Sequence, residues 1–142
     1  MGVTFDAYYD PEHREPVALS TSAEADELLD RMVAEAESPD VNVGVVAQLD
    51  REDETGWVST LQFGVRAAAT TCGFVIHMTK GKPTVISDNG GTSPVMIDYD
   101  YQSHPREIPQ NAEITWPTVR QAVHDHVASS GARPSMITWR EP

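Results

Sequence analysis

The sequence predicts an α+β domain in which an antiparallel meander carries two main helices on one face. Apolar and polar residues alternate in several short runs that turn residues separate, as they do in half-buried strands. Two longer segments, one toward each end, instead repeat apolar residues at helical spacing. The 142 residues contain no linker or internal repeat, so we expect a single domain over residues 1–142.

Two short strands and the first helix are predicted in the N-terminal part. Residues 3–9 and 15–19 have strand patterns on either side of a turn. Thr21 and Glu24 then have the spacing of a capping box, which marks a helix start. The helix is predicted to end near Pro39. Its apolar stripe consists of Ala25, Leu28, Leu29, Met32, Val33 and Ala36.

A long hairpin with an acidic tip is predicted next. Residues 41–49 and 57–65 alternate with period two, and the polar residues 50–56 separate them. Because a hairpin tip is solvated, we expect its carboxylates to be exposed. The residues that share one face are Val41, Val43, Val45, Ala47 and Leu49 in the first strand, and Trp57, Ser59, Leu61, Phe63 and Val65 in the second.

Three further strands complete the predicted meander. Residues 74–78 and 84–87 form two of them, with turns at residues 80–83 and 88–91. The strand over residues 95–101 has two contrasting faces. Val95, Ile97, Tyr99 and Tyr101 are predicted to point into the core, and Met96, Asp98 and Asp100 to be exposed together.

The C-terminal part is predicted to hold a loop, the second helix and a closing strand. Residues 104–112 contain two prolines and favour a loop or an irregular edge. Thr115 can cap a helix that has Pro117 in its first turn and stops by Gly131. Residues 136–139 form the closing strand, in which Trp139 is expected to be buried.

The composition excludes several classes of function. Ten Lys and Arg residues against 22 Asp and Glu residues give a net charge of −12, which disfavours binding to nucleic acid through phosphate contacts. The single cysteine excludes a disulfide scaffold. No apolar run approaches the roughly 20 residues of a membrane span, and the N-terminus lacks a signal-peptide pattern. We therefore expect a cytoplasmic protein with neither a membrane nor a nucleic acid as its partner.

The negative charge is concentrated in the first 60 residues. They hold 15 acidic side chains against Arg14, Arg31 and Arg51, whereas the remaining residues hold seven acids and seven bases. One interpretation is a well-solvated surface that keeps the protein soluble. The other is an acidic face that steers a basic partner toward the protein.

Few residues are suited to catalysis or metal binding. His124 and His126 are two apart on a predicted helix, so they face away from each other and do not suit a metal. Cys72 has no nearby base in the sequence and is interpreted as an inert thiol. Asp98 and Asp100 share a strand face, which a hydrolase or a merely solvated surface would both explain. We expect no enzyme activity, no cofactor and no metal.

The last part of the chain carries a pattern that a known family shares. Residues 119–127 form an amphipathic helix, followed within residues 131–139 by an Arg-Pro pair and a Trp preceded by an aliphatic residue. This ending resembles the immunity-protein family numbered one of bacterial polymorphic toxin systems. The matching residues are Arg133, Pro134, Ile137 and Trp139. The resemblance implies an α+β fold, no catalysis, and a cognate toxin encoded by an adjacent gene, commonly a nucleic-acid deaminase and sometimes a nuclease.

The resemblance and the charge support one hypothesis about mechanism. An inhibitor can block a toxin's basic groove by placing carboxylates where phosphates would lie. The alternative interpretation is an acidic adaptor domain that binds a nontoxic protein, and a hydrolase using the two strand aspartates is a third. The candidate partner-binding residues are Asp50, Glu52, Asp53, Glu54, Trp57, Met96, Asp98 and Asp100.

Overall fold

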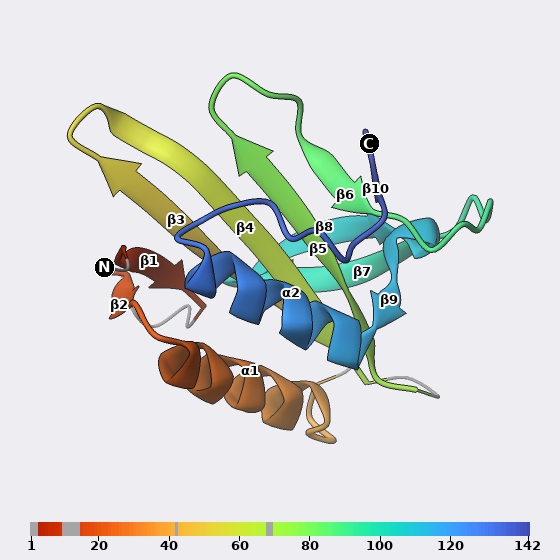
Figure 1. Cartoon of the computed structure of the whole chain (residues 1–142). Coiled ribbons are helices and arrows are strands. Elements are labelled where there is room, and N and C mark those ends of the chain that lie inside the picture. The colour runs from red at the N-terminus through yellow and green to blue at the C-terminus, as the bar shows by residue number, and fades with distance from the viewer. Residues whose placement is uncertain (1–2, 10–14, 42, 68–69) are drawn as a thin grey trace.

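The fold is the α+β arrangement that the sequence predicts: one large, mostly antiparallel sheet with two helices on one face (Figure 1). The computed structural model describes residues 3–9, 15–41, 43–67 and 70–142. Within them the main strand order is β10-β6-β5-β4-β3-β1-β2, with β7, β8 and β9 outside this path. The strands are β1 (Phe5–Tyr8), β2 (Val17–Leu19), β3 (Gly44–Asp53), β4 (Gly56–Arg66), β5 (Cys72–Thr79), β6 (Val85–Ser87), β7 (Met96–Tyr101), β8 (His104–Pro109), β9 (Ile114–Thr115) and β10 (Trp139–Arg140).

The two helices begin where the sequence signals place them. In α1 (Ser22–Ala36), the Thr21 hydroxyl accepts the Glu24 amide and the Glu24 carboxylate accepts the Thr21 amide, both at 3.2 Å, which confirms the capping box. In α2 (Trp116–Ala128), Pro117 occupies the first turn as predicted. Thr115 is at the N-cap position, but its hydroxyl contacts the Thr118 hydroxyl and does not cap the helix.

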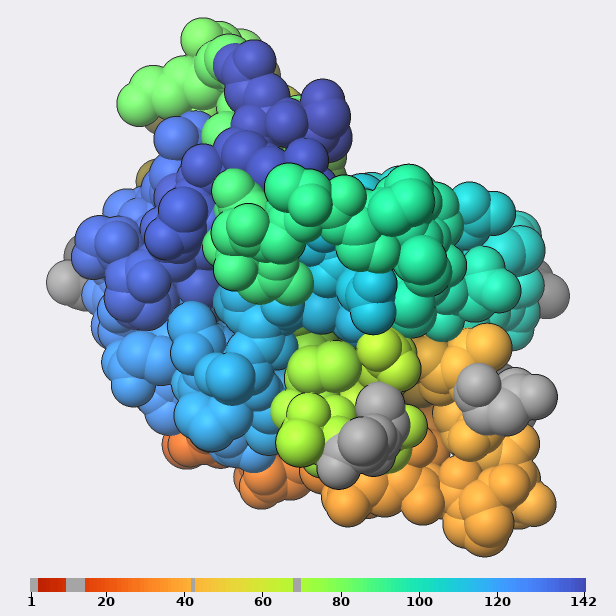
Figure 2. Space-filling view, turned by 90° about the vertical axis from the view of Figure 1, so that its right-hand side faces the viewer, coloured from red at the N-terminus to blue at the C-terminus, as the bar shows by residue number. Residues whose placement is uncertain are grey.

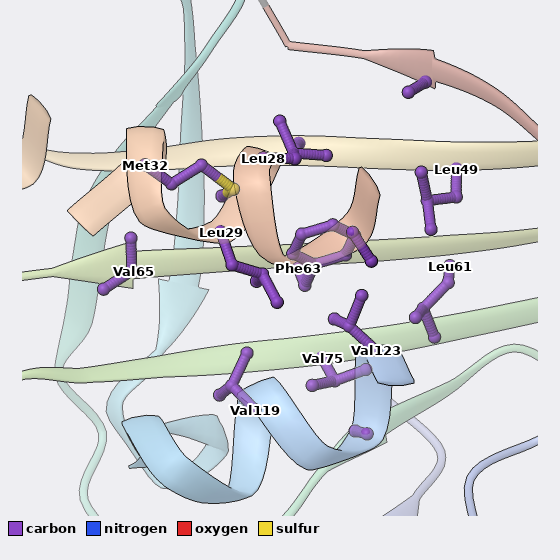
Figure 3. Close-up of a cluster of buried hydrophobic side chains, with 14 of the residues drawn as sticks. Leu28, Leu29, Met32, Leu49, Leu61, Phe63, Val65, Val75, Val119 and Val123 are labelled. Atoms are coloured by element: carbon purple, nitrogen blue, oxygen red, sulfur yellow. The ribbon is translucent and has the colours of Figure 1, made fainter. Parts of the chain in front are cut away.

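The main core fills the space between the helices and one face of the sheet, here called the helix face (Figure 3). Phe63 at its centre has no exposed surface, and burying a side chain of that size contributes about 1.5–3 kcal/mol. The apolar stripes of both helices point at the central strands, which holds the helices on this face. The core side chains labelled in the figure are Leu28, Leu29, Met32, Leu49, Leu61, Phe63, Val65, Val75, Val119 and Val123.

A second core lies on the opposite face of the sheet, here called the ribbon face because the β7–β8 ribbon covers part of it (Figure 1). Tyr99 packs edge-on against Phe74, with ring centroids 4.9 Å apart. Glycine at position 44 permits this approach, because a Cβ there would lie 2.4 Å from the Tyr99 ring. The buried residues are Val46, Phe74, Ile76, Ile86, Tyr99, Ile108 and Ala112.

The β7–β8 ribbon corrects two expectations for this part of the chain. Residues 104–112 were expected to be a loop or an irregular edge, but they form β8 and a short 3-10 helix, Gln110–Ala112. Within the described residues β8 pairs only with β7, so the missing amides of Pro105 and Pro109 cost no pairing with a further strand. Val95 was expected in the core, but it precedes β7 and is 49% exposed.

The long hairpin differs from its prediction in where it turns and how it twists. β3 continues to Asp53 and β4 starts at Gly56, so Asp50 and Glu52 are strand residues and not part of the tip. A bulge between Arg51 and Glu52 shifts the register. It separates Trp57 from Ser59, Leu61, Phe63 and Val65, with which the alternation grouped it, and places it on the ribbon face.

Two other apolar side chains, Val43 and Trp139, are more exposed than their strand patterns suggest. Val43 is 37% exposed because it lies before β3 begins. Trp139 is half-buried, and its indole N–H donates to the Pro134 carbonyl at 2.9 Å. The closing strand β10 consists of Trp139 and Arg140 only, shorter and later than residues 136–139.

Candidate partner-binding surface

A strip of polar and aromatic side chains runs along the ribbon face beyond its apolar core. Strand alternation places Asp6 and Tyr8 on this face, because Phe5 and Ala7 are buried on the other. β3 and β4 supply the middle of the strip, and β7 and β8 supply its border. We call it the polar strip, and it consists of Asp6, Tyr8, Gln48, Asp50, Trp57, Thr60, Gln62, Tyr101 and Arg106.

A continuous chain of hydrogen bonds orders the polar strip across three strands. The Asp50 Oδ1 atom accepts from the Thr60 hydroxyl at 2.6 Å and from Gln48 Nε2 at 3.0 Å. On one side, the Trp57 indole N–H donates to the Thr60 hydroxyl at 2.8 Å. On the other, Gln62 donates to Gln48 at 3.2 Å and accepts from Arg106 Nε at 3.0 Å. These side chains are therefore held in place before any partner arrives.

The polar strip carries uncompensated negative charge at its β1–β3 end. Asp6 and Asp50 are directly opposite each other in the strand register. Among the described residues, neither carboxylate takes part in an ion pair. Burial raises the pKa of Tyr8, and the charges of Asp50, Asp6 and Glu52 raise it further. Burial, followed by Asp50 and Tyr8, likewise raises the pKa of Tyr101 to about 12.

The predicted acidic residues at the tip lie next to this end of the strip. Glu52 and Glu54 are exposed. The Asp53 carboxylate accepts the Thr55 amide at 2.7 Å, and its hydrogen bonds from Thr55 hold its pKa below the usual value. Asp50, Glu52, Asp53, Glu54 and Trp57 therefore lie at one end of the hairpin, as the sequence predicts, although Asp50 and Trp57 belong to the hydrogen-bonded strip.

The other three predicted residues lie at the opposite end of β3. Tyr99 of β7 pairs with Gly44, nine residues before Asp53, and a strand of that length spans about 30 Å. Met96 and Asp98 are exposed and line a pocket of about 310 Å³ between β7 and the segment after α1 (Figure 2). Asp100 is half-buried, and its carboxylate accepts the Ser103 amide at 3.3 Å.

Four contacts to the Glu113 carboxylate form a polar cluster that the sequence did not predict. The Glu113 carboxylate accepts two hydrogen bonds from Arg66, the longer at 2.8 Å, one from Tyr99 at 2.7 Å, and the Cys72 thiol lies 3.6 Å away. Burial alone would raise the pKa of Glu113, but the bonds from Arg66 and Tyr99 outweigh it and lower the pKa. Burial and then the Glu113 charge raise the pKa of Cys72, which makes its thiol a poor nucleophile.

The histidines point in different directions. His124 Nε2 lies 2.6 Å from Asp26 on the α1 side, at 30% side-chain exposure. His126 is fully buried beside the rings of Phe5 and His77.

Within the described part of the chain, no group of three or more His, Cys, Asp or Glu side chains could hold a metal ion. In the same residues, no helix is long and apolar enough to cross a membrane.

A comparison with models of known protein families agrees with the sequence pattern. The family model described as Immunity protein Imm1 matches residues 13–141, which is nearly the whole chain. A search of curated proteins finds no match. The family match includes the C-terminal helix, the Arg133-Pro134 pair and Trp139, which are the features that resembled this family in the sequence. The chain belongs to the Imm1 family of immunity proteins.

Proposed function

We propose that this protein binds a cognate toxin and inhibits it in the cytoplasm of the cell that makes both. The observation that carries the proposal is the family match over residues 13–141, because immunity proteins protect their producer from a toxin. In this proposal the toxin is encoded by an adjacent gene. The protein acts by binding, without a cofactor and without catalysis of its own.

The charge distribution supports occlusion of a nucleic-acid site. A toxin that is a nucleic-acid deaminase, or else a nuclease, needs basic side chains to hold phosphates. The first 60 residues of this chain carry the whole net charge of −12 and supply the hairpin end of the polar strip. Carboxylates presented from this end would occupy the toxin's phosphate positions and exclude its substrate.

The proposed contact residues form two groups. The hairpin group is Asp50, Glu52, Asp53, Glu54 and Trp57, and the β7 group is Met96, Asp98 and Asp100. Along β3 the two groups are about 16 Å apart at their nearest, from Asp50 to Val45, the partner of Asp100, and about 30 Å at their farthest, which is comparable with the width of a standard protein interface that buries about 800 Å² on each partner. One toxin molecule could therefore contact both groups, with most of the charge attraction at the hairpin group.

The surroundings of the candidate catalytic side chains do not favour catalysis, which supports a binding role. The thiol of Cys72 is partly buried beside the Glu113 carboxylate, so its reactive thiolate is disfavoured. The Asp98 side chain is exposed on a strand, and Asp100 contacts a turn amide.

The decisive experiment expresses the adjacent gene with and without this protein. We expect the adjacent gene alone to stop growth, co-expression to restore it, and the two products to purify as a complex. The purified complex should lack the deaminase or nuclease activity of the free toxin. The proposal fails if the folded protein neither restores growth nor binds the adjacent gene product.

The core variant Phe63→Ala provides a control for loss of fold, because it removes a fully buried side chain on the opposite face of the sheet from the polar strip. A surface variant that no longer protects cells from the toxin, but has the melting temperature of the unaltered protein, has lost the interface and kept the fold. Binding of a nontoxic protein in place of the adjacent gene product would instead favour the acidic adaptor domain.

A further inference from the structure

Two carboxylates face each other across strands, and none of the described cationic side chains forms an ion pair with either of them. Asp6 on β1 is the register partner of Asp50 on β3, and both lie on the ribbon face. Side chains directly opposite in an antiparallel pair have Cβ atoms about 4.5–5.5 Å apart, where like charges destabilise the sheet. Asp50 Oδ2 accepts no hydrogen bond from the described residues, so it is open to an incoming donor.

The cations nearest in sequence do not relieve this repulsion. Arg51, next to Asp50, points to the helix face, where its guanidinium donates to the Ser130 carbonyl at 2.9 Å. Arg106 belongs to the polar strip, but its Nε donates to Gln62, and two glutamines separate it from Asp50. Among the described residues, neither carboxylate of the Asp6–Asp50 pair therefore has a cationic partner.

An exposed aromatic ring is fixed beside the same carboxylates. The Trp57 indole N–H bonds to Thr60, whose hydroxyl bonds to Asp50, so a single atom links the ring to the carboxylate. Trp57 is 39% exposed although it is pinned at its nitrogen. A large aromatic that is held rigid and left partly uncovered is typical of an interface anchor.

We propose that Asp6, Asp50 and Trp57 form a receptor for one arginine side chain of the partner. The inference rests on the proposed function, in which that partner is the toxin. A planar guanidinium can stack on the indole and donate forked hydrogen bonds to the two carboxylates at the same time. A lysine ammonium is a compact point charge and cannot do both, so the receptor selects arginine.

The free protein maintains this receptor at a cost in stability. Asp6→Asn removes the repulsion, and Asp6 is not part of the hydrogen-bond chain. We expect this variant to melt about 2 °C higher at low salt, and to bind the partner about tenfold more weakly. A residue with a purely structural role would not show stability and affinity changing in opposite directions.

The first test needs no toxin. Hexa-arginine and hexa-lysine peptides are titrated into the protein, and the indole N–H resonance of Trp57 is followed by NMR after assignment with Trp57→Phe. We expect hexa-arginine to move this resonance about tenfold more strongly than hexa-lysine, and Asp6→Asn or Asp50→Asn to abolish the difference. Asp40→Asn is the matched control, since it removes an exposed carboxylate after α1.

Equal responses to the two peptides, or an unchanged response in Asp6→Asn and Asp50→Asn, overturn the receptor. The second test measures binding of the adjacent gene product to the same variants. If that product binds the unaltered protein and both receptor variants equally, the receptor is wrong and the proposed function stands. If it does not bind the unaltered protein at all, the proposed function fails, and the peptide titration decides the receptor alone.

Discussion

The two faces of the sheet differ in how completely other elements cover them. The helix face is closed by two helices, and its central side chains, such as Leu61 and Phe63, have no exposed surface. The ribbon face is closed only under β7 and β8, and beyond them the same strands carry hydrogen-bonded polar groups. The comparison teaches that close apolar packing stabilises the helix face. The open part of the ribbon face instead carries side chains, such as Asp6 and Asp50, that we expect to destabilise the free protein.

The titratable groups of the two faces differ in the same way. On the helix face, His77 and His126 are buried, and burial lowers the pKa of both. On the ribbon face, Asp6 and Asp50 are only partly buried and lie opposite each other in the strand register. Stability should therefore depend on pH through the helix face and on salt through the ribbon face.

Truncating the centre of the helix face should have the largest effect. Phe63→Ala removes a fully buried ring between the helices and β4, so we expect the free energy of unfolding to fall by about 3–5 kcal/mol. Urea denaturation measures the change. The matched substitution on the ribbon face is Trp57→Ala, which we expect to cost less because the ring is partly exposed. An equal loss for the two variants would remove the distinction between the faces.

Acid should destabilise the helix face through its buried histidine. Burial lowers the pKa of His126 to about 4, so the unfolded chain binds this proton first as the pH falls. Stability is full above pH 6.5 and decreases toward pH 4, by about 3 kcal/mol in total for this group. Urea denaturation at several pH values gives the slope, to which His77 adds in the same direction.

His126→Phe tests the assignment of this slope. The variant keeps a ring beside Phe5 but cannot bind a proton, so its stability should vary less between pH 6.5 and 4. His124→Gln is the control, because His124 is partly exposed and contacts Asp26 on the other side of α2. If the slope survives in His126→Phe, another group causes the acid sensitivity.

Local signals predicted the elements that depend on neighbours in sequence. The capping box of Thr21 and Glu24 and the apolar stripe after it place α1 within a residue or two. The strand β8 was missed because Pro105 and Pro109 are ordinary signs of a loop, and only its pairing with β7 shows that both are tolerated. Such pairing depends on contacts that the local pattern does not contain.

The candidate site was predictable only in part, for the same reason. Glu52, Asp53 and Glu54 follow from the acidic run at the hairpin end. The bulge that moves Trp57 to the ribbon face has no signature in the sequence. Alternation places Asp6 on a strand face, but nothing local says that β3 lies beside it with Asp50 opposite. Glu113 was likewise missed because its partner Arg66 is 47 positions away.

Removing the charge at Glu113 should have an intermediate effect on the ribbon face. Glu113→Gln weakens the hydrogen bonds from Arg66 and Tyr99, so we expect a loss of about 2 kcal/mol in urea denaturation. It also removes a negative charge that raises the pKa of Cys72, so iodoacetamide should alkylate this thiol faster near neutral pH. Glu107→Gln on β8 is the exposed control. Unchanged stability with unchanged alkylation would show that the cluster is not coupled to the thiol.

Charge reversal at the hairpin end should have the smallest effect on stability. Glu52 and Glu54 are exposed, so Glu52→Lys with Glu54→Lys should change the free energy of unfolding by no more than about 0.5 kcal/mol. The same variant should associate with the toxin about tenfold more slowly at low salt, because the steering field is reversed where the charge is concentrated. Stopped-flow measurements over a range of salt concentrations give the rate. Asp98→Lys reverses one charge at the far end of β3 and should slow association less, since the hairpin end carries more of the acidic side chains. If Asp98→Lys slows association as much as the double variant does, the toxin approaches the β7 group first, and the polar strip is not the part of the ribbon face that guides the encounter.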